Sequence, residues 1–141
     1  MFTVTKVIHF CYGHRLLNYH GKCRYLHGHN GTVEIDLSAA ELDRRGMVRD
    51  FTDIKRMIQG WIDEHVDHKM ILCTRDPVLP ILRKLNEPIF VIPDNPTAEN
   101  LAKLIYAQAR RMKLPVARVR LWETDSSVAT YSPRPARKQR A

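Results

Sequence analysis

Three histidines near the start of the chain have the residue type and the spacing of a metal site: His14, His27 and His29. In an extended segment residues i and i+2 point to the same face, so His27 and His29 can direct both imidazoles at one point. His14, arriving from a preceding strand, can supply a third. Three neutral imidazoles suit Zn²⁺ and leave one tetrahedral position free, which is typical of a catalytic zinc site. The alternative is that H-G-H forms a polar turn whose histidines are only hydrogen-bonded.

The strand that carries two of these histidines favours the metal interpretation. It is predicted over residues 27–39, where Val33, Ile35 and Leu37 share the parity of the two histidines. Both imidazoles are therefore expected on the apolar face, where ligands are shielded from competing water. Alternation also predicts a preceding strand over residues 2–10.

Two acidic positions have the chemistry of a reactive site. Asp67 and His68 follow a helix predicted over residues 52–65, and a carboxylate beside a histidine can fix the orientation and tautomer of the ring. The alternative is a solvated helix end. Glu123 ends the apolar face of a strand predicted over residues 116–124. The amidine-like N–H edge of a ligand would partner this carboxylate, and the alternative is a strand-end glutamate in solvent.

The remaining elements complete an α+β pattern. A second helix begins after its N-cap Thr97, and a last short strand covers residues 127–132. The linking segment 70–94 is the hardest to interpret; it contains a possible short helix over 77–85 and a short strand over 89–92. The order of two strands, two helices and two strands predicts an antiparallel four-stranded sheet with both helices on one face.

Length and composition predict one domain over residues 1–132, followed by a basic, disordered tail over 133–141. The net charge is +8, and four of the positive charges lie in that tail, so nucleic-acid contact is a less favoured alternative. Cys11, Cys23 and Cys73 are too few for a disulfide framework. With no signal-peptide pattern and no apolar run that could cross a bilayer, we expect a cytoplasmic protein without membrane contact.

Six motifs, taken in order, resemble the 6-pyruvoyl-tetrahydropterin synthase / 6-carboxytetrahydropterin synthase family. They are F-C-Y-G-H-R-L (10–16), K-C-R-Y-L-H-G-H-N (22–30), G-M-V-R-D-F (46–51), D-H (67–68), N-P-T-A-E-N (95–100) and W-E-T (122–124). The resemblance implies a tunnelling fold (T-fold), in which the sheets of three subunits join into a barrel. It also implies a homohexamer, a dimer of trimers, with active sites at subunit interfaces.

The resemblance assigns roles residue by residue. The positions that match the family's functional residues are, for Zn²⁺, His14, His27 and His29; for proton transfer, Cys23, Asp67, His68 and Glu123; and for the pterin pocket, Glu123, Thr97 and Glu99. The C-x-x-x-H-G-H spacing resembles the bacterial enzymes of the queuosine (7-deazaguanine) pathway. These convert 7,8-dihydroneopterin triphosphate to 6-carboxy-5,6,7,8-tetrahydropterin, and they release acetaldehyde and triphosphate.

Two alternatives to that activity remain open. One is a 6-pyruvoyl-tetrahydropterin synthase or another dihydroneopterin-processing relative, and the other is a non-catalytic basic zinc module that binds nucleic acid. The chain also departs from the family pattern at Cys11, Tyr12 and Gly13, where small residues are usual, and at Gly31, where a bulkier residue is usual. We expect Cys11 to be a small core residue, with a position near the metal as the alternative.

Overall fold

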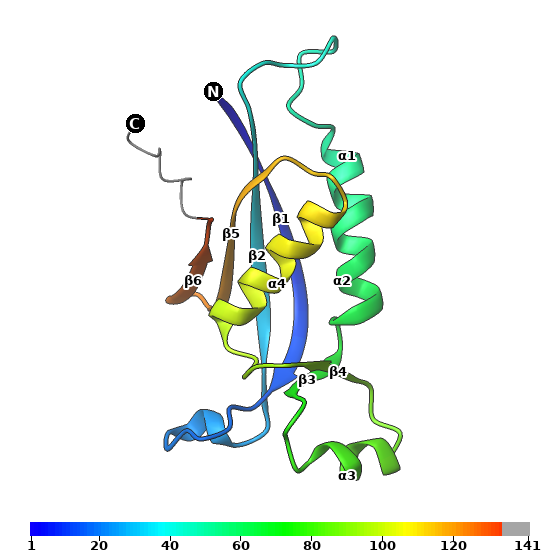
Figure 1. The fold of residues 1–141 in the computed structure, drawn as a ribbon, viewed down its shortest axis with the longest axis vertical. Helices are drawn as coiled ribbons and strands as arrows, with labels where there is room; N and C mark the ends of the chain where they lie inside the picture. Colours follow the sequence, from blue (N-terminus) through cyan, green and yellow to red (C-terminus); the bar gives the residue numbers. More distant parts are fainter. Residues whose placement is uncertain (134–141) are drawn as a thin grey trace, which may run out of the picture.

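The computed structural model describes residues 1–133, which form a six-stranded mixed sheet in the order β4-β3-β1-β2-β5-β6 (Figure 1). The strands are β1 (Phe2–His14), β2 (His27–Ala39), β3 (Lys69–Cys73), β4 (Ile89–Ile92), β5 (Val116–Thr124) and β6 (Ser127–Tyr131). The predicted tail falls almost entirely on residues 134–141, outside the described residues.

The long hairpin of β1 and β2 is the centre of the sheet. The two strands pair antiparallel along their whole lengths, from Phe2 opposite Ala39 to His14 opposite His27. Strand β1 therefore extends four residues beyond the Phe10 end that alternation predicts, and it carries His14 itself. The end of the hairpin at which His14 pairs with His27 lies with β3 and β4 at one end of the molecule (Figure 1).

The prediction of a four-stranded, wholly antiparallel sheet is wrong in strand number and direction. Strands β1, β2, β5 and β6 are antiparallel neighbours as predicted, but β3 lies parallel to β1, and β4 lies parallel to β3. The predicted short strand over 89–92 is β4, whereas β3 was not predicted. Ile71, Leu72 and Cys73 are all buried, so β3 has no alternation that would distinguish it from other apolar segments.

Two helical segments cover the sheet. The first runs without a break through α1 (Phe51–Ile54), the π-helical segment η2 (Lys55–Gln59) and α2 (Gly60–His65), and the second is α4 (Ala98–Arg111). Short helices η1 (Lys22–Arg24) and α3 (Leu79–Lys84) lie in the connections. Within residues 1–133 no helix is long and apolar enough to span a membrane.

Local sequence places the starts of both covering helices. The side chain of Asp50 accepts a hydrogen bond from the backbone N–H of Thr52 at 2.8 Å. The hydroxyl of Thr97 accepts one from the backbone N–H of Asn100 at 3.2 Å, as predicted for the N-cap of α4. Each cap satisfies an N–H group that has no partner within the helix.

Both helical segments lie on the same face of the sheet, as predicted (Figure 1). One core joins the inward residues of the strands to the helices; its members include Ile8, Val33, Ile35, Leu37, Ile58, Ile62, Leu101, Ile105, Val119 and Leu121. Because His14, His27 and His29 share the parity of these strand residues, the hairpin places all three on the covered face.

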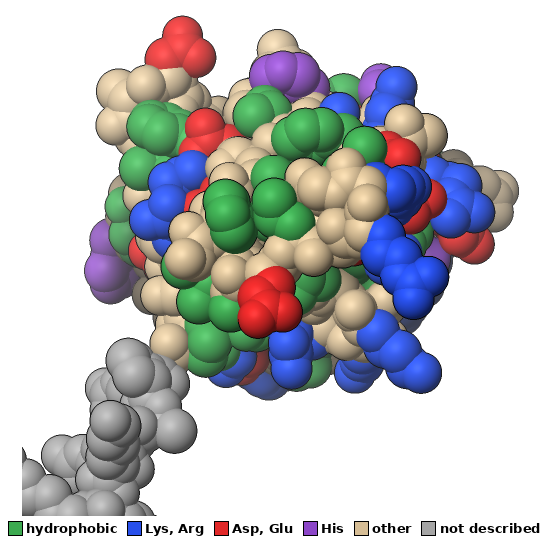
Figure 2. All heavy atoms as spheres, turned by 90° about the horizontal axis from the view of Figure 1, so that it is seen from above, with side chains coloured by type: hydrophobic (Ala, Val, Ile, Leu, Met, Phe, Trp, Pro, Cys, Tyr) green, Lys and Arg blue, Asp and Glu red, His purple; other side chains and the backbone are tan. Residues whose placement is uncertain are grey.

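The opposite face is polar, and no helix of residues 1–133 covers it. Buried Asp36 accepts hydrogen bonds from the hydroxyl of Thr5 and from Nε of Arg118, each at 2.7 Å. Seen along the strands from the end with the N-terminus, Lys and Arg side chains lie mainly at the margin, with hydrophobic side chains nearer the centre (Figure 2).

Candidate metal centre and active site

The three predicted metal ligands meet at the end of the central hairpin. His14 is the last residue of β1 and stands opposite His27, the first residue of β2, while His29 follows two residues later. One donor nitrogen from each ring lies within 4.8 Å of the other two. The ring centroids are 4.5–5.0 Å apart, so the imidazoles converge as the spacing predicts.

Backbone carbonyls set the tautomers of two of these rings. Nδ1 of His14 donates to the carbonyl of Pro96 at 2.7 Å, and Nδ1 of His27 donates to the carbonyl of Tyr25 at 2.7 Å. Since a carbonyl only accepts, a neutral ring at each position carries its proton on Nδ1 and presents the Nε2 lone pair to the centre. This arrangement of an outer hydrogen bond behind each donor nitrogen is typical of metal-binding histidines.

The donor atoms fit a cation. Nε2 of His27 is buried and has no hydrogen-bond partner among residues 1–133, and Nε2 of His14 lies 3.1 Å from Nε2 of His29. A metal ion would satisfy the orphaned nitrogen and both facing nitrogens together. Three imidazole donors suit zinc among the common metals.

Burial keeps the rings of His14 and His29 neutral, which is the form that binds a metal. Burial lowers the pKa of His14 to about 4, with a further decrease from neighbouring His27 and His29 and a partial increase from the bond to Pro96. Burial also lowers the pKa of His29, although the charge of Glu123 opposes that shift.

Glu123 lies beside the centre without closing it. Its Oε1 is 3.8 Å from Nε2 of His14, and its side chain is about one-quarter exposed. In the described part of the chain, the side chains whose donor atoms converge here are the three histidines alone. A metal held by these histidines would therefore keep a fourth position for a substrate or water.

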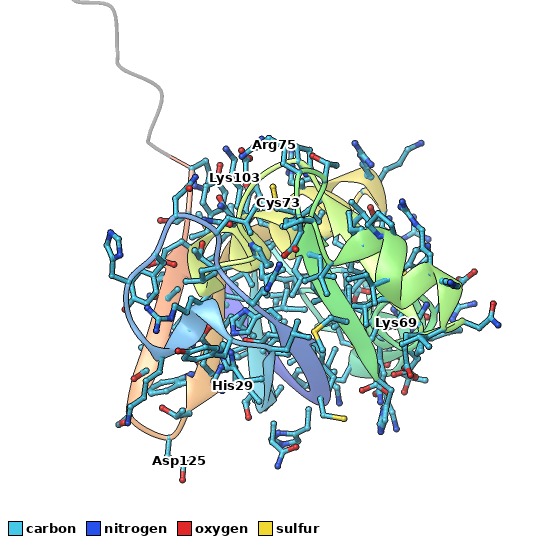
Figure 3. The ribbon with its side chains drawn as sticks, turned by 90° about the horizontal axis from the view of Figure 1, so that it is seen from below. His29, Lys69, Cys73, Arg75, Lys103 and Asp125 are labelled. Carbon is cyan, nitrogen blue, oxygen red and sulfur yellow. The ribbon has the colours of Figure 1, made fainter. Side chains whose placement is uncertain are left out.

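Two cavities flank the histidine centre. The larger, of about 470 Å³, is lined by Cys11, His27, His29, His68 and Lys69 together with neighbouring residues. Figure 3 views the fold from the end of the molecule that carries the histidine centre, and it labels His29 and Lys69 there. The smaller, of about 280 Å³, is lined by His14, Cys23, Thr97, Glu99 and Glu123, among others.

The predicted site residues are thereby divided into two groups. Cys23, Glu123, Thr97 and Glu99 lie together on the cavity that also reaches His14. His68 lies on the other cavity. Within one chain, then, the predicted catalytic thiol and the predicted Asp67–His68 pair do not share a cavity.

The partner of the Asp67–His68 pair in this chain is Cys11. Sγ of Cys11 is 3.3 Å from Nε2 of His68, and Nδ1 of His68 is 2.7 Å from Oδ2 of Asp67. The other carboxylate oxygen of Asp67 accepts the backbone N–H of Cys11 at 3.0 Å. Cys11 is only partly buried. The expectation of a small core residue is therefore wrong; nothing local to Cys11 reveals a partner 57 residues away.

Tyr12 is a second residue near the centre whose place the spacing did not predict. Its ring stacks on Phe10 and meets His14 edge-on, with centroids 5.2 and 5.3 Å apart. Tyr12 is 3% exposed, and its hydroxyl has no hydrogen-bond partner among the described residues. Burial raises the pKa of Tyr12 well above its usual value, and the negative charge of Glu123 raises it further.

Fold and site together define a class: an α+β domain with a three-histidine centre able to hold a metal with one position free. The model of the family described as 6-pyruvoyl tetrahydropterin synthase matches residues 3–134. The chain belongs to this family.

Relatives of known name agree with that membership. A 6-carboxy-5,6,7,8-tetrahydropterin synthase of Rickettsia bellii is 40% identical over 104 residues, which cover 72% of this chain and 75% of the relative. The protein of the same name from Haemophilus influenzae is 32% identical over 140 residues, covering 93% of this chain and 99% of its own.

The fold is similar to that of two solved structures. An uncharacterized protein from Wolinella succinogenes has a TM-score of 0.79 at 27% identity, covering 93% of this chain and 97% of its own. The 6-pyruvoyl tetrahydropterin synthase of Caenorhabditis elegans has a TM-score of 0.70 at 23% identity, covering 94% and 95%, and supports the fold.

Proposed function

We propose that this chain is a zinc-dependent 6-carboxy-5,6,7,8-tetrahydropterin synthase, a lyase of queuosine (7-deazaguanine) biosynthesis. It would convert 7,8-dihydroneopterin triphosphate to 6-carboxy-5,6,7,8-tetrahydropterin and release acetaldehyde and triphosphate. The observation that carries the proposal is the convergence of His14, His27 and His29 on one point, with a coordination position free and with Cys23 and Glu123 on the adjoining cavity. Relatives that bear this enzyme's name add support.

The three histidines would hold Zn²⁺. When bound there, zinc would make the substrate's side-chain hydroxyls more acidic and would stabilise negative charge on their oxygens. Pro96 and Tyr25 contribute by holding the Nδ1 protons of His14 and His27, which keeps each Nε2 free as a donor to the metal.

Glu123 would anchor the substrate. Its carboxylate lies beside His14 and lines the smaller cavity. There it can accept hydrogen bonds from two N–H groups on the aminopyrimidine edge of a pterin. Thr97 and Glu99, at the start of α4, line the same cavity and would contact the ring. This anchoring would place the substrate's side chain toward the histidine centre.

Proton transfer would involve Cys23 and the Asp67–His68 pair. Cys23, as a thiolate, would take a carbon-bound proton. Asp67 holds Nδ1 of His68 at 2.7 Å and thereby orients the ring for proton return. Since Cys23 and His68 lie on different cavities of one chain, we propose that the working site combines these groups from neighbouring subunits of a homohexamer, a dimer of trimers.

One assay tests the function directly. Zinc-loaded protein incubated with 7,8-dihydroneopterin triphosphate should release acetaldehyde in step with 6-carboxytetrahydropterin. Release of triphosphate with 6-pyruvoyl-tetrahydropterin and without acetaldehyde would instead assign the pyruvoyl-type reaction. No turnover of this substrate would contradict the proposal.

A Cys23→Ala variant tests the assigned chemistry. Turnover should be abolished while zinc content and the thermal unfolding midpoint stay unchanged, because Cys23 is not among the three metal donors. An exposed residue of the same connection that lines neither cavity supplies the control: His20→Gln should retain turnover. Full activity of Cys23→Ala would remove Cys23 from the mechanism.

A further inference from the structure

The Cys11–His68–Asp67 cluster, whose donor atoms lie within 4.8 Å of one another, is arranged as a hydrogen-bonded chain. Asp67 meets Nδ1 of His68, and Cys11 meets Nε2, so the carboxylate and the thiol occupy opposite edges of one imidazole. A thiol, an imidazole and a carboxylate in this order are the parts of a proton relay.

The backbone holds the relay in place. His68 donates its N–H to the carbonyl of Cys11 at 2.7 Å, and Asp67 accepts the N–H of Cys11, so the two segments are bonded in both directions. The parallel pairing of β1 with β3 begins at once, with Tyr12 opposite Lys69. His68 itself has a φ of 56°, a left-handed conformation that is uncommon for a residue with a side chain.

The thiol and the imidazole open on the cavity that reaches the metal centre. Cys11 and His68 line it together with His27 and His29. Lys69 and Glu87 also line this cavity and contribute one charge of each sign. In the proposed homohexamer this wall would face the Cys23 and Glu123 cavity of a neighbouring subunit, so that the thiol can face the reacting carbon of a substrate held there.

We propose that Cys11 is a second catalytic thiol, the cavity-side end of a Cys11–His68–Asp67 relay that returns a proton to the substrate. This inference rests on the proposed function, in which Cys23 removes a carbon-bound proton and His68 mediates the return.

The return step balances as follows. The S–H bond of Cys11 breaks, and its proton forms a C–H bond with the carbanion carbon of the substrate. The thiolate then takes the Nε2 proton of the imidazolium of His68, which becomes neutral and keeps its Nδ1–H on Asp67. One proton has moved from His68 to carbon, and Cys11 is restored as a thiol.

Thiol alkylation tests the coupling without any substrate. Native protein is treated with iodoacetamide, and the labelling rates of Cys11 and Cys23 are followed separately by peptide mass spectrometry. His68→Gln and Asp67→Asn should each slow the labelling of Cys11 by about tenfold, because the imidazole no longer takes the thiol proton. His20→Gln, which changes an exposed histidine, is the control and should leave the rate unchanged.

The alkylation result is decisive in either direction. A Cys11 rate that does not respond to His68→Gln, a slowing confined to Cys23, or a Cys11 that is not labelled at all would overturn the proposal. Cys73 is fully buried and reports any global unfolding by becoming labelled.

Kinetics test the role in turnover. Cys11→Ala should lower kcat for acetaldehyde release by about 100-fold with KM unchanged, the effect expected for loss of a proton-transfer group. Cys11→Ser, which keeps a hydroxyl of similar size, should retain part of the rate. An unchanged kcat in Cys11→Ala would overturn the proposal, whereas an inactive parent protein would contradict the proposed function and leave the alkylation result to decide the relay.

Discussion

Gly31 lies against the ring of Tyr12: a Cβ at the glycine would stand 3.0 Å from Cε1 of Tyr12 and 3.4 Å from Cε1 of Phe10. The resemblance gives these as two of the positions at which the chain departs from the family pattern, and in the structure the two residues fit against each other. The tyrosine ring fills the space that a side chain at position 31 would take. The large side chain of Tyr12 on β1 thus packs where Gly31 on β2 has no side chain.

This packing predicts that Gly31→Ala destabilises the protein. The added methyl group must displace a ring already stacked on Phe10, and overpacking of this kind costs about 1–3 kcal/mol. Urea denaturation measures the change. Gly60→Ala is the control, because a Cβ there meets nothing within 4 Å and alanine favours the helix by about 1 kcal/mol. Equal stability of the two variants would contradict the close contact.

The buried hydroxyl of Tyr12 predicts an opposite effect for Tyr12→Phe. A polar group without a partner costs about 1–3 kcal/mol when it is buried, so its removal should raise the free energy of unfolding of the metal-free protein by about 1 kcal/mol. Chemical denaturation without metal provides the measurement. A loss of stability would mean instead that the hydroxyl donates to Glu123, the nearby acid that raises its pKa.

The lowered pKa of His14 predicts the pH dependence of the metal-free fold. The folded protein holds this ring neutral down to about pH 4, whereas the unfolded chain takes up the proton near pH 6.5. The stabilising contribution is therefore complete above pH 6.5 and is lost as the pH falls toward 4. Its full size is about 3 kcal/mol, from about 1.4 kcal/mol for each pH unit.

Urea denaturation between pH 4 and pH 7 in the presence of a chelator checks this dependence. His14→Gln is the matched variant, because its stability should have a shallower slope over the same range whatever its absolute value. An identical slope in both proteins would show that another group controls the dependence.

Metal binding should depend on each of the three histidines. His27→Ala and His29→Ala should each reduce zinc affinity by more than about 100-fold, since changes behind the ligands alone cost 10–100-fold. Zinc content after dialysis and the rise in unfolding temperature on zinc addition both report the loss. His20→Ala, at an exposed position, should bind zinc as the parent does. Retention of zinc by both site variants would place the metal elsewhere.

The amino-acid sequence alone was sufficient for features set by neighbours along the chain. Two-residue alternation places His27 and His29 on the same side as Val33, and the structure finds them on the covered face. The cap at Thr97 follows in the same way, because a capping side chain reaches only the next two or three N–H groups.

Tertiary structure decided which distant segments meet. Strand β3 has no alternation, so its parallel place beside β1 depends on packing across more than 50 residues of chain. That pairing brings Cys11 to His68 and leaves Cys23 on the other side of the histidine centre. Periodicity records the direction of each side chain within one strand, but the neighbour of that strand is selected by the burial of the whole core.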